Sequence, residues 1–119
     1  MKYDSNRDWR ERSFQFACEL FDFCDDLAHR PGPSRRLSYQ LFDAGSSIGA
    51  NLAESQASYS RKELGSKDAI ALKESKETKF WLRLADAKAL GKPELRRWLL
   101  QEADEFVAML TIGVKNLQQ

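Results

Sequence analysis

Two carboxylates, Glu74 and Glu77, lie three residues apart and would share one face of a helix. In a four-helix bundle, paired carboxylates raise the possibility of a di-iron site, but such a site takes a Glu-x-x-His motif from two of its helices. The chain has one histidine, His29, and it stands beside a proline turn, so the imidazole ligands of such a site are missing. We therefore predict no metal site and no metal cofactor.

The two cysteines and the glycines also give no indication of a catalytic or phosphate-binding site. Cys18 and Cys24 are six residues apart within apolar helical stripes, where a thiol is inert, and about 9 Å along a helix is beyond the reach of a disulfide. Gly45 and Gly49 lie inside a predicted helix, where they would let a neighbouring backbone come close, and no phosphate-loop lysine follows them. We predict no catalytic and no cofactor-binding residue. An enzyme with a site shared between subunits is the remote alternative.

Two groups of polar residues remain as candidate sites. Lys76, Lys79 and Arg83 recur at helical spacing beside Lys73, and they would form a basic ridge that could contact phosphates. The other group is a set of amide and carboxylate side chains that we interpret as a register-setting network, meeting lysine or arginine across a helix pair or a subunit boundary: Asn51, Glu54, Glu74 and Glu77. The alternative for both groups is an ordinary solvated helix face.

The overall charge does not favour a dedicated nucleic-acid binder. Lys and Arg number 19 and Asp and Glu number 18, which gives a formal net charge of +1. The charge is unevenly distributed, however. Residues 8–30 carry three arginines and six acidic residues, whereas residues 61–90 carry eight basic and five acidic residues. These two segments could attract each other within a bundle or between subunits.

The chain is expected to be one domain, residues 1–119, with a single hydrophobic core. The N-terminal residues lack the apolar region of a secretory signal, and no apolar run approaches the ~20 residues that cross a bilayer. Free thiols suit a reducing compartment. These features predict a cytoplasmic protein that makes no membrane contact.

Apolar residues recur with helical spacing in four segments, and no segment alternates with period two. Two pairs, Asp8 with Glu11 and Ser60 with Glu63, have the spacing of capping boxes. Proline or glycine punctuates the connections, and short connections give antiparallel neighbours. The predicted fold is all-α, an up-down antiparallel four-helix bundle with helices at about 8–28, 34–58, 61–90 and 93–117.

The first predicted helix carries two adjacent apolar stripes, more than one face of a monomeric bundle needs. One stripe contains Phe14, Ala17, Phe21, Cys24 and Ala28. We expect the other stripe to be exposed on a single chain and to form an oligomer interface: Phe16, Leu20, Phe23 and Leu27.

Two sequence blocks, SSIGANLAESQASYSRKEL and AIALKESKETKFWLRLADA, carry a family resemblance. The chain resembles the small bacterial four-helix-bundle family that includes the protein encoded in intervening sequences of 23S ribosomal RNA, and it is similar to the accessory variability proteins of diversity-generating retroelements. The segments RSFQFACEL and EFVAMLTIGVKNL also match, so the resemblance covers nearly the whole chain. It implies a cytosolic homo-oligomer, typically a pentameric ring of bundles, with no known catalytic activity.

The retroelement relatives bind a reverse transcriptase and nucleic acid through a basic surface. The resemblance therefore also implies RNA, DNA or a nucleic-acid enzyme as a partner. The near-neutral charge and the acidic first helix depart from that pattern, and Ser55 stands where many members have glycine. We expect a homo-oligomeric binding or scaffold protein. The alternative is a nucleic-acid-binding accessory factor that uses the basic ridge.

Overall fold

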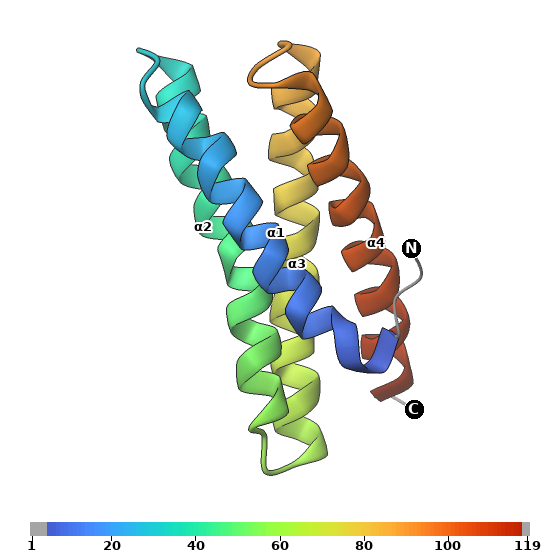
Figure 1. The fold of residues 1–119 in the computed structure, drawn as a ribbon. Coiled ribbons are helices and arrows are strands. Elements are labelled where there is room, and N and C mark those ends of the chain that lie inside the picture. The colour runs from blue at the N-terminus through green and yellow to red at the C-terminus, as the bar shows by residue number, and fades with distance from the viewer. Residues whose placement is uncertain (1–4, 118–119) are drawn as a thin grey trace.

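A computed structural model describes the backbone of residues 5–117 and the side chains of residues 9–117. Within this range the chain forms four helices and no strand: α1 (Ser5–Ala28), α2 (Pro33–Gln56), α3 (Arg61–Ala87) and α4 (Pro93–Leu117). The helices run alternately up and down beside one another (Figure 1). The predicted all-α, antiparallel four-helix bundle is confirmed.

α1 begins at Ser5, three residues before the predicted start, and the side chain of Asp8, on which the first predicted capping box depends, lies outside the described residues. At the start of α3 the Ser60 half of the predicted box is confirmed, because the Ser60 hydroxyl accepts a hydrogen bond from the Glu63 backbone N–H at 3.0 Å. This bond satisfies one of the donors that a helix N-terminus leaves without an intrahelical partner.

The third helix ends at Ala87, three residues before the predicted end. Ala89 adopts a left-handed backbone with φ of 54°, and the Leu90 N–H returns to the Ala85 carbonyl at 2.9 Å, the closing bond of a Schellman turn. Glycine usually occupies that left-handed position, so an alanine there gives no sequence signal. The buried Arg96 donates to the Leu90 carbonyl at 2.6 Å and holds the turn from α4.

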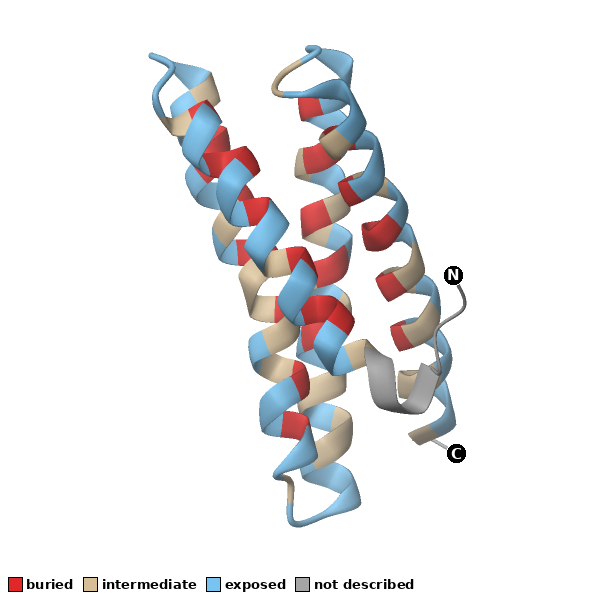
Figure 2. Cartoon of the chain, in the orientation of Figure 1, coloured by how far each residue is buried: buried red, intermediate tan, exposed pale blue. Residues whose placement is uncertain are grey.

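One hydrophobic core fills the interior, and buried residues line the inward side of each helix (Figure 2). The Phe106 ring stands edge-on to the Phe16 and Trp9 rings, with centroids 5.5 Å apart in each pair. Burying an aromatic or leucine side chain stabilises a fold by ~1.5–3 kcal/mol. The largest fully buried apolar side chains come from all four helices: Phe16, Phe23, Leu20, Leu27, Leu41, Ile48, Leu82, Leu99, Phe106 and Leu110.

α1 packs closely on α2 because two glycines of α2 leave room for it. A Cβ atom on Gly45 would overlap the Leu20 side chain, and one on Gly49 would lie 3.1 Å from the Ser13 hydroxyl. The prediction that these glycines admit a neighbouring helix is therefore confirmed.

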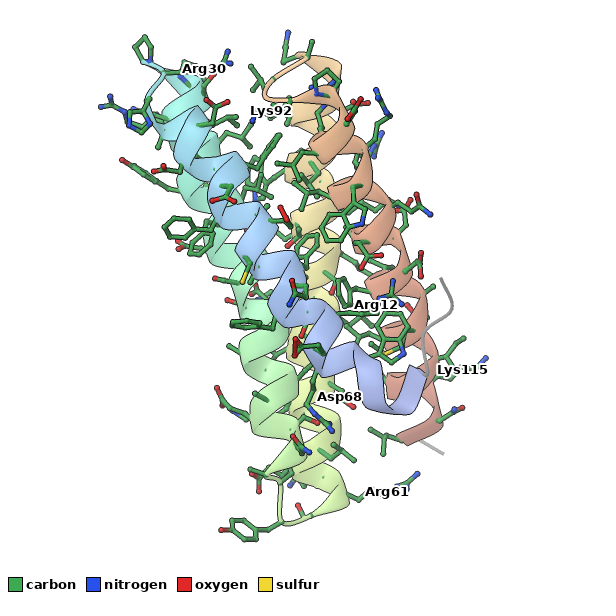
Figure 3. The ribbon with its side chains drawn as sticks, viewed as in Figure 1. Arg12, Arg30, Arg61, Asp68, Lys92 and Lys115 are labelled. Carbon is green, nitrogen blue, oxygen red and sulfur yellow. The ribbon has the colours of Figure 1, made fainter. Side chains whose placement is uncertain are left out.

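The seam between α1 and α4 is much the smallest of the four contacts between neighbouring helices. A buried ion pair closes it. Arg12 donates to both Glu102 carboxylate oxygens, at 3.3 and 2.6 Å, and to Glu105 at 2.8 Å (Figure 3). Its guanidinium also stacks 4.2 Å above the Trp9 ring. Burial lowers the pKa of Arg12, but the hydrogen bonds and charges of the two carboxylates outweigh that effect and raise it. This cation therefore stays charged inside the bundle.

Candidate interaction surfaces

α1 buries the apolar stripe that we expected to be exposed. Phe16, Leu20 and Leu27 are 0% exposed and Phe23 is 2% exposed, so the single chain already covers them. Their predicted place on an outer, interface-forming surface is wrong. The physical reason lies in the facing elements: Leu20 fits against Gly45, and Phe23 packs where a side chain on Gly91 would overlap it.

The two phenylalanines of the neighbouring stripe of α1 point outward instead, whereas Cys24 of the same stripe is buried. Phe14 is 61% exposed and Phe21 is 58% exposed, and the Phe21 ring lies edge-on to Phe42 of α2 with centroids 5.7 Å apart. Tyr39 of α2 is 58% exposed. We call these four residues the aromatic face. A recess of about 200 Å³ opens beside three of them, away from Phe14, and is lined by Phe21, Cys24, Asp25, Ala28, Ser38, Tyr39 and Phe42.

The two cysteines lie in different environments. Cys24 is buried, and this burial raises the pKa of its thiol to about 12. The thiol is therefore protonated and inert at neutral pH, as expected. Cys18 is exposed on the outer side of α1, which differs from its predicted place in an apolar stripe.

A larger hollow lies between the first half of α2 and the second half of α3. Its volume is about 490 Å³, and we call it the α2–α3 groove. The Trp81 indole on its wall donates to the Glu77 carboxylate at 3.1 Å, which fixes the ring against the groove. The groove joins residues of two helices, so no local pattern in the sequence pointed to it. The lining residues are Gly32, Pro33, Arg36, Leu37, Gln40, Trp81 and Leu84.

Three side chains of the basic ridge face solvent, and the fourth bridges α3 and α4. Lys73, Lys76 and Arg83 are exposed, whereas Lys79 forms an ion pair of 2.8 Å with Asp104 of α4. Phe80 stands beside them with 56% of its side chain exposed. The structure therefore presents three outward cations around an exposed aromatic ring.

The four predicted register residues do not form one network. Asn51 donates to a carbonyl of its own helix at 2.9 Å, and Glu77 is engaged by Trp81 on its own helix. Glu54 makes the expected cross-helix pair, with Lys67 of α3 at 2.7 Å. Glu74 is half-buried; burial raises its pKa, and the charges of Glu77 and Asp43 add to this effect, while Lys73 lowers it.

Within residues 9–117, no three His, Cys, Asp or Glu side chains gather as metal ligands would. In the described part of the chain, no helix combines the length and the apolar character that would let it cross a membrane.

Comparison with known proteins places this arrangement in a family. The family model described as 23S rRNA-intervening sequence protein matches residues 6–112. The chain belongs to this family. A crystal structure of a protein of unknown function from the S23 ribosomal protein family of Bacteroides thetaiotaomicron is similar, with a TM-score of 0.79. The two are 28% identical over 89% of this chain and 97% of the other. No curated protein matches the sequence.

The match to the 23S rRNA-intervening sequence protein family reaches into all four helices, so it includes both apolar hollows. It also includes Ser55, at the position where the resemblance led us to expect glycine. The buried Ser55 hydroxyl donates to the Asp68 carboxylate at 2.8 Å and links α2 to α3. Figure 3 labels Asp68. In this family member, the serine thus has a structural partner.

Proposed function

We propose that this member of the 23S rRNA-intervening sequence protein family is a non-enzymatic scaffold that associates with copies of itself through the aromatic face. The observation that carries the proposal is the exposure of Phe21 and Tyr39 beside the half-buried Phe42, with Phe14 exposed two turns earlier on α1. Single exposed apolar residues are ordinary, but a contiguous aromatic surface is typical of protein interfaces. The expected assembly is the pentameric ring that the family resemblance implies.

The non-enzymatic part of the proposal rests on how the reactive groups are engaged. The Cys24 thiol is buried and protonated. Glu54 is paired with Lys67, and Glu77 accepts a hydrogen bond from Trp81, so these carboxylates serve the packing of the bundle. A cytoplasmic location is part of the same proposal, since free thiols suit a reducing compartment.

Light scattering coupled to size exclusion tests the self-association. The wild-type chain should elute as an oligomer, and the double substitution Phe14→Ser with Phe21→Ser should convert it to a monomer with unchanged helix content. Ile112→Ser is a matched control, because Ile112 is also 61% exposed but lies on α4. A wild-type protein with the mass of one chain would contradict the proposal.

A second candidate function is nucleic-acid binding by the basic ridge. The favouring observation is that Lys73, Lys76 and Arg83 are exposed around the 56%-exposed Phe80, since cations and a stackable ring together are typical of single-strand binding surfaces. The partner would be RNA, DNA or an enzyme that acts on them.

Filter binding to a single-stranded oligonucleotide at several salt concentrations tests this candidate. Replacing Lys76 and Arg83 by glutamine should weaken binding and reduce the log–log salt slope by about one unit for each lost phosphate contact. Lys79→Gln should have a smaller effect, because Lys79 is paired with Asp104. Wild-type affinity no tighter than ~0.1 mM near physiological salt would retire the hypothesis.

A further inference from the structure

The α2–α3 groove has the size and the lining of a small-molecule site. Its volume is about 490 Å³, and ligand pockets usually measure ~300–1,000 Å³, with mostly apolar walls and a few polar groups. Both helices contribute apolar walls here. Besides the Trp81 indole, the polar side chains among the lining residues are Arg36 and Gln40. An apolar molecule in this groove would therefore cover few polar groups that need water.

Trp81 gives the groove a flat wall that is fixed before any ligand arrives. Its indole N–H donates to the Glu77 carboxylate at 3.1 Å, and its ring stands edge-on to Phe80 with centroids 5.1 Å apart. The ring is half-buried, so part of it stays accessible from the groove. A flat aromatic molecule can stack on this wall at little entropic cost to the protein, because the side chain is already ordered.

The groove lies at a basic end of the bundle. The loops that join α1 to α2 and α3 to α4 are both at this end, where Figure 3 labels Arg30 and Lys92. Arg36 lines the groove, and the exposed Lys88 follows groove residue Leu84 by one helical turn. Residues 29–36 and 87–93 together contain five lysines and arginines and no aspartate or glutamate: Arg30, Arg35, Arg36, Lys88 and Lys92.

Arg36 differs from neighbouring arginines because the bundle does not use its guanidinium. Arg35 donates to the Ala28 carbonyl at 3.1 Å, and Arg96 pairs with Asp86 at 2.7 Å. Arg36 makes no side-chain hydrogen bond or ion pair with any residue that the structure describes. An arginine that borders an apolar groove without a carboxylate partner is suited to an anionic ligand group, which it can bind through two parallel hydrogen bonds.

The acidic groups near the groove lie toward its other end. α2 and α3 are antiparallel, so the start of α2, with Arg36, lies beside the end of α3 (Figure 1). Glu77 borders the groove one turn before Trp81, about three helical turns or ~16 Å from Lys88, and its carboxylate is bound by the indole. Asp43 likewise lies further along α2 than the groove. The groove thus offers an aromatic wall at Trp81 and cations at the end next to the loops.

We propose that the α2–α3 groove binds a small planar aromatic molecule that carries one anionic group, a carboxylate, sulfonate or phosphate. The ring system lies against Trp81, and the anionic group accepts hydrogen bonds from Arg36 with the charge of Lys88 beside it. The inference goes beyond the scaffold function and is independent of self-association, because no residue that lines the groove belongs to the aromatic face.

Calorimetric titration with naphthalene-2-sulfonate tests the assignment, and 2-naphthalenemethanol serves as its uncharged counterpart. The wild-type chain should bind the sulfonate with a Kd tighter than about 1 mM, and it should bind the alcohol about tenfold more weakly or worse. Arg36→Gln should reduce the affinity for the sulfonate about tenfold, to that for the alcohol, because it removes the charge-assisted hydrogen bonds.

Arg35→Gln is the matched control. It removes the same charge from the adjacent residue, whose guanidinium donates to the Ala28 carbonyl instead of lining the groove. This variant should bind the sulfonate within about twofold of the wild type. Circular dichroism should show wild-type helix content for both variants.

The indole N–H signals in a ¹H–¹⁵N spectrum locate the probe. The chain has three tryptophans, and the signal of Trp81 should shift when the sulfonate is added, whereas those of Trp9 and Trp98 should not. Trp81→Phe identifies the signal by removing it. A shift at Trp98 in place of Trp81 would put the probe on α4 and overturn the assignment.

The other outcomes that overturn the inference are also distinct. Equal losses in Arg35→Gln and Arg36→Gln would show a general attraction to the basic end, and equal affinities for the two probes would show an unselective apolar surface. Sulfonate binding that appears only on dilution to single chains would show that a second copy covers the groove. A wild-type chain with no affinity tighter than about 1 mM would also overturn it, while the mass of the chain decides the proposed self-association separately.

Discussion

The two sides of α1 have similar compositions, but one side is buried and the other is exposed. Phe16 and Leu20 on one side are 0% exposed, whereas Phe14 and Phe21 on the other are 61% and 58% exposed. Both sides offer aromatic rings at helical spacing, so their own hydrophobicity does not decide which one enters the core. The facing helix decides it, because Gly45 of α2 leaves space for Leu20. The space that the facing helix leaves thus determines which side of α1 is buried in the core.

The largest expected effect comes from emptying the buried side. Phe16→Ala should lower the free energy of unfolding by about 3–5 kcal/mol, because it removes a ring packed against Phe106 and leaves a cavity. Urea denaturation followed by circular dichroism measures this loss. A cost below about 1 kcal/mol would mean that Phe16 is not a core residue.

Breaking the ion pair on the same side should cost nearly as much. Arg12→Met leaves the buried Glu102 carboxylate without its main cation and should destabilise the fold by about 3–5 kcal/mol. The double variant Arg12→Met with Glu102→Leu should recover much of the loss, since no buried charge remains unpaired. Equal destabilisation by the single and double variants would show that the penalty has another source.

Filling the space that Gly45 leaves for α1 should destabilise the fold by a smaller amount. Gly45→Ala places a methyl group against Leu20 and should destabilise the fold by about 1–3 kcal/mol through overpacking, despite the better helix propensity of alanine. Gly113→Ala is the matched control, because a Cβ atom there meets nothing within 4 Å. Thermal melts of the two variants should shift in opposite directions; a Gly45→Ala variant as stable as the control would contradict the close approach.

The exposed side should contribute least to the fold. Phe21→Ala should change the free energy of unfolding by less than about 0.5 kcal/mol at concentrations where the chain is monomeric. At higher concentration, the wild type should gain thermal stability from association and the variant should not. Melting curves over a range of concentrations would show the difference.

The number and direction of the helices could be predicted because helical periodicity and proline or glycine breaks are local signals. The end of α3 could not, since Ala89 takes a left-handed conformation that usually marks glycine. The assignment of the two sides of α1 failed for a different reason. Periodicity shows which residues share a side, but it does not show that Gly45 and Gly91 lie opposite Leu20 and Phe23.

The candidate surfaces were predictable only in part. The cations of the basic ridge share one helix, so their spacing was enough to group them. The α2–α3 groove joins two segments, Gly32–Gln40 and Trp81–Leu84, and its existence depends on how two helices meet. The pairing of Arg12 with Glu102, 90 residues away, was likewise beyond any local pattern.

The Arg12–Glu102 pair also bears on the order in which the bundle forms. Contacts between α2 and α3, such as Ser55 with Asp68, close a loop of 13 residues, whereas the α1–α4 seam closes one of 90. Loop-closure entropy makes the longer closure roughly 1.7 kcal/mol more costly. The smallest seam is thus also the most non-local, and it should form last and open first. Amides of α1 should then exchange with solvent faster than those of α2 and α3. The α2–α3 hairpin is therefore the stable centre of the bundle, and the Arg12–Glu102 pair closes α1 onto α4 only after that hairpin has formed.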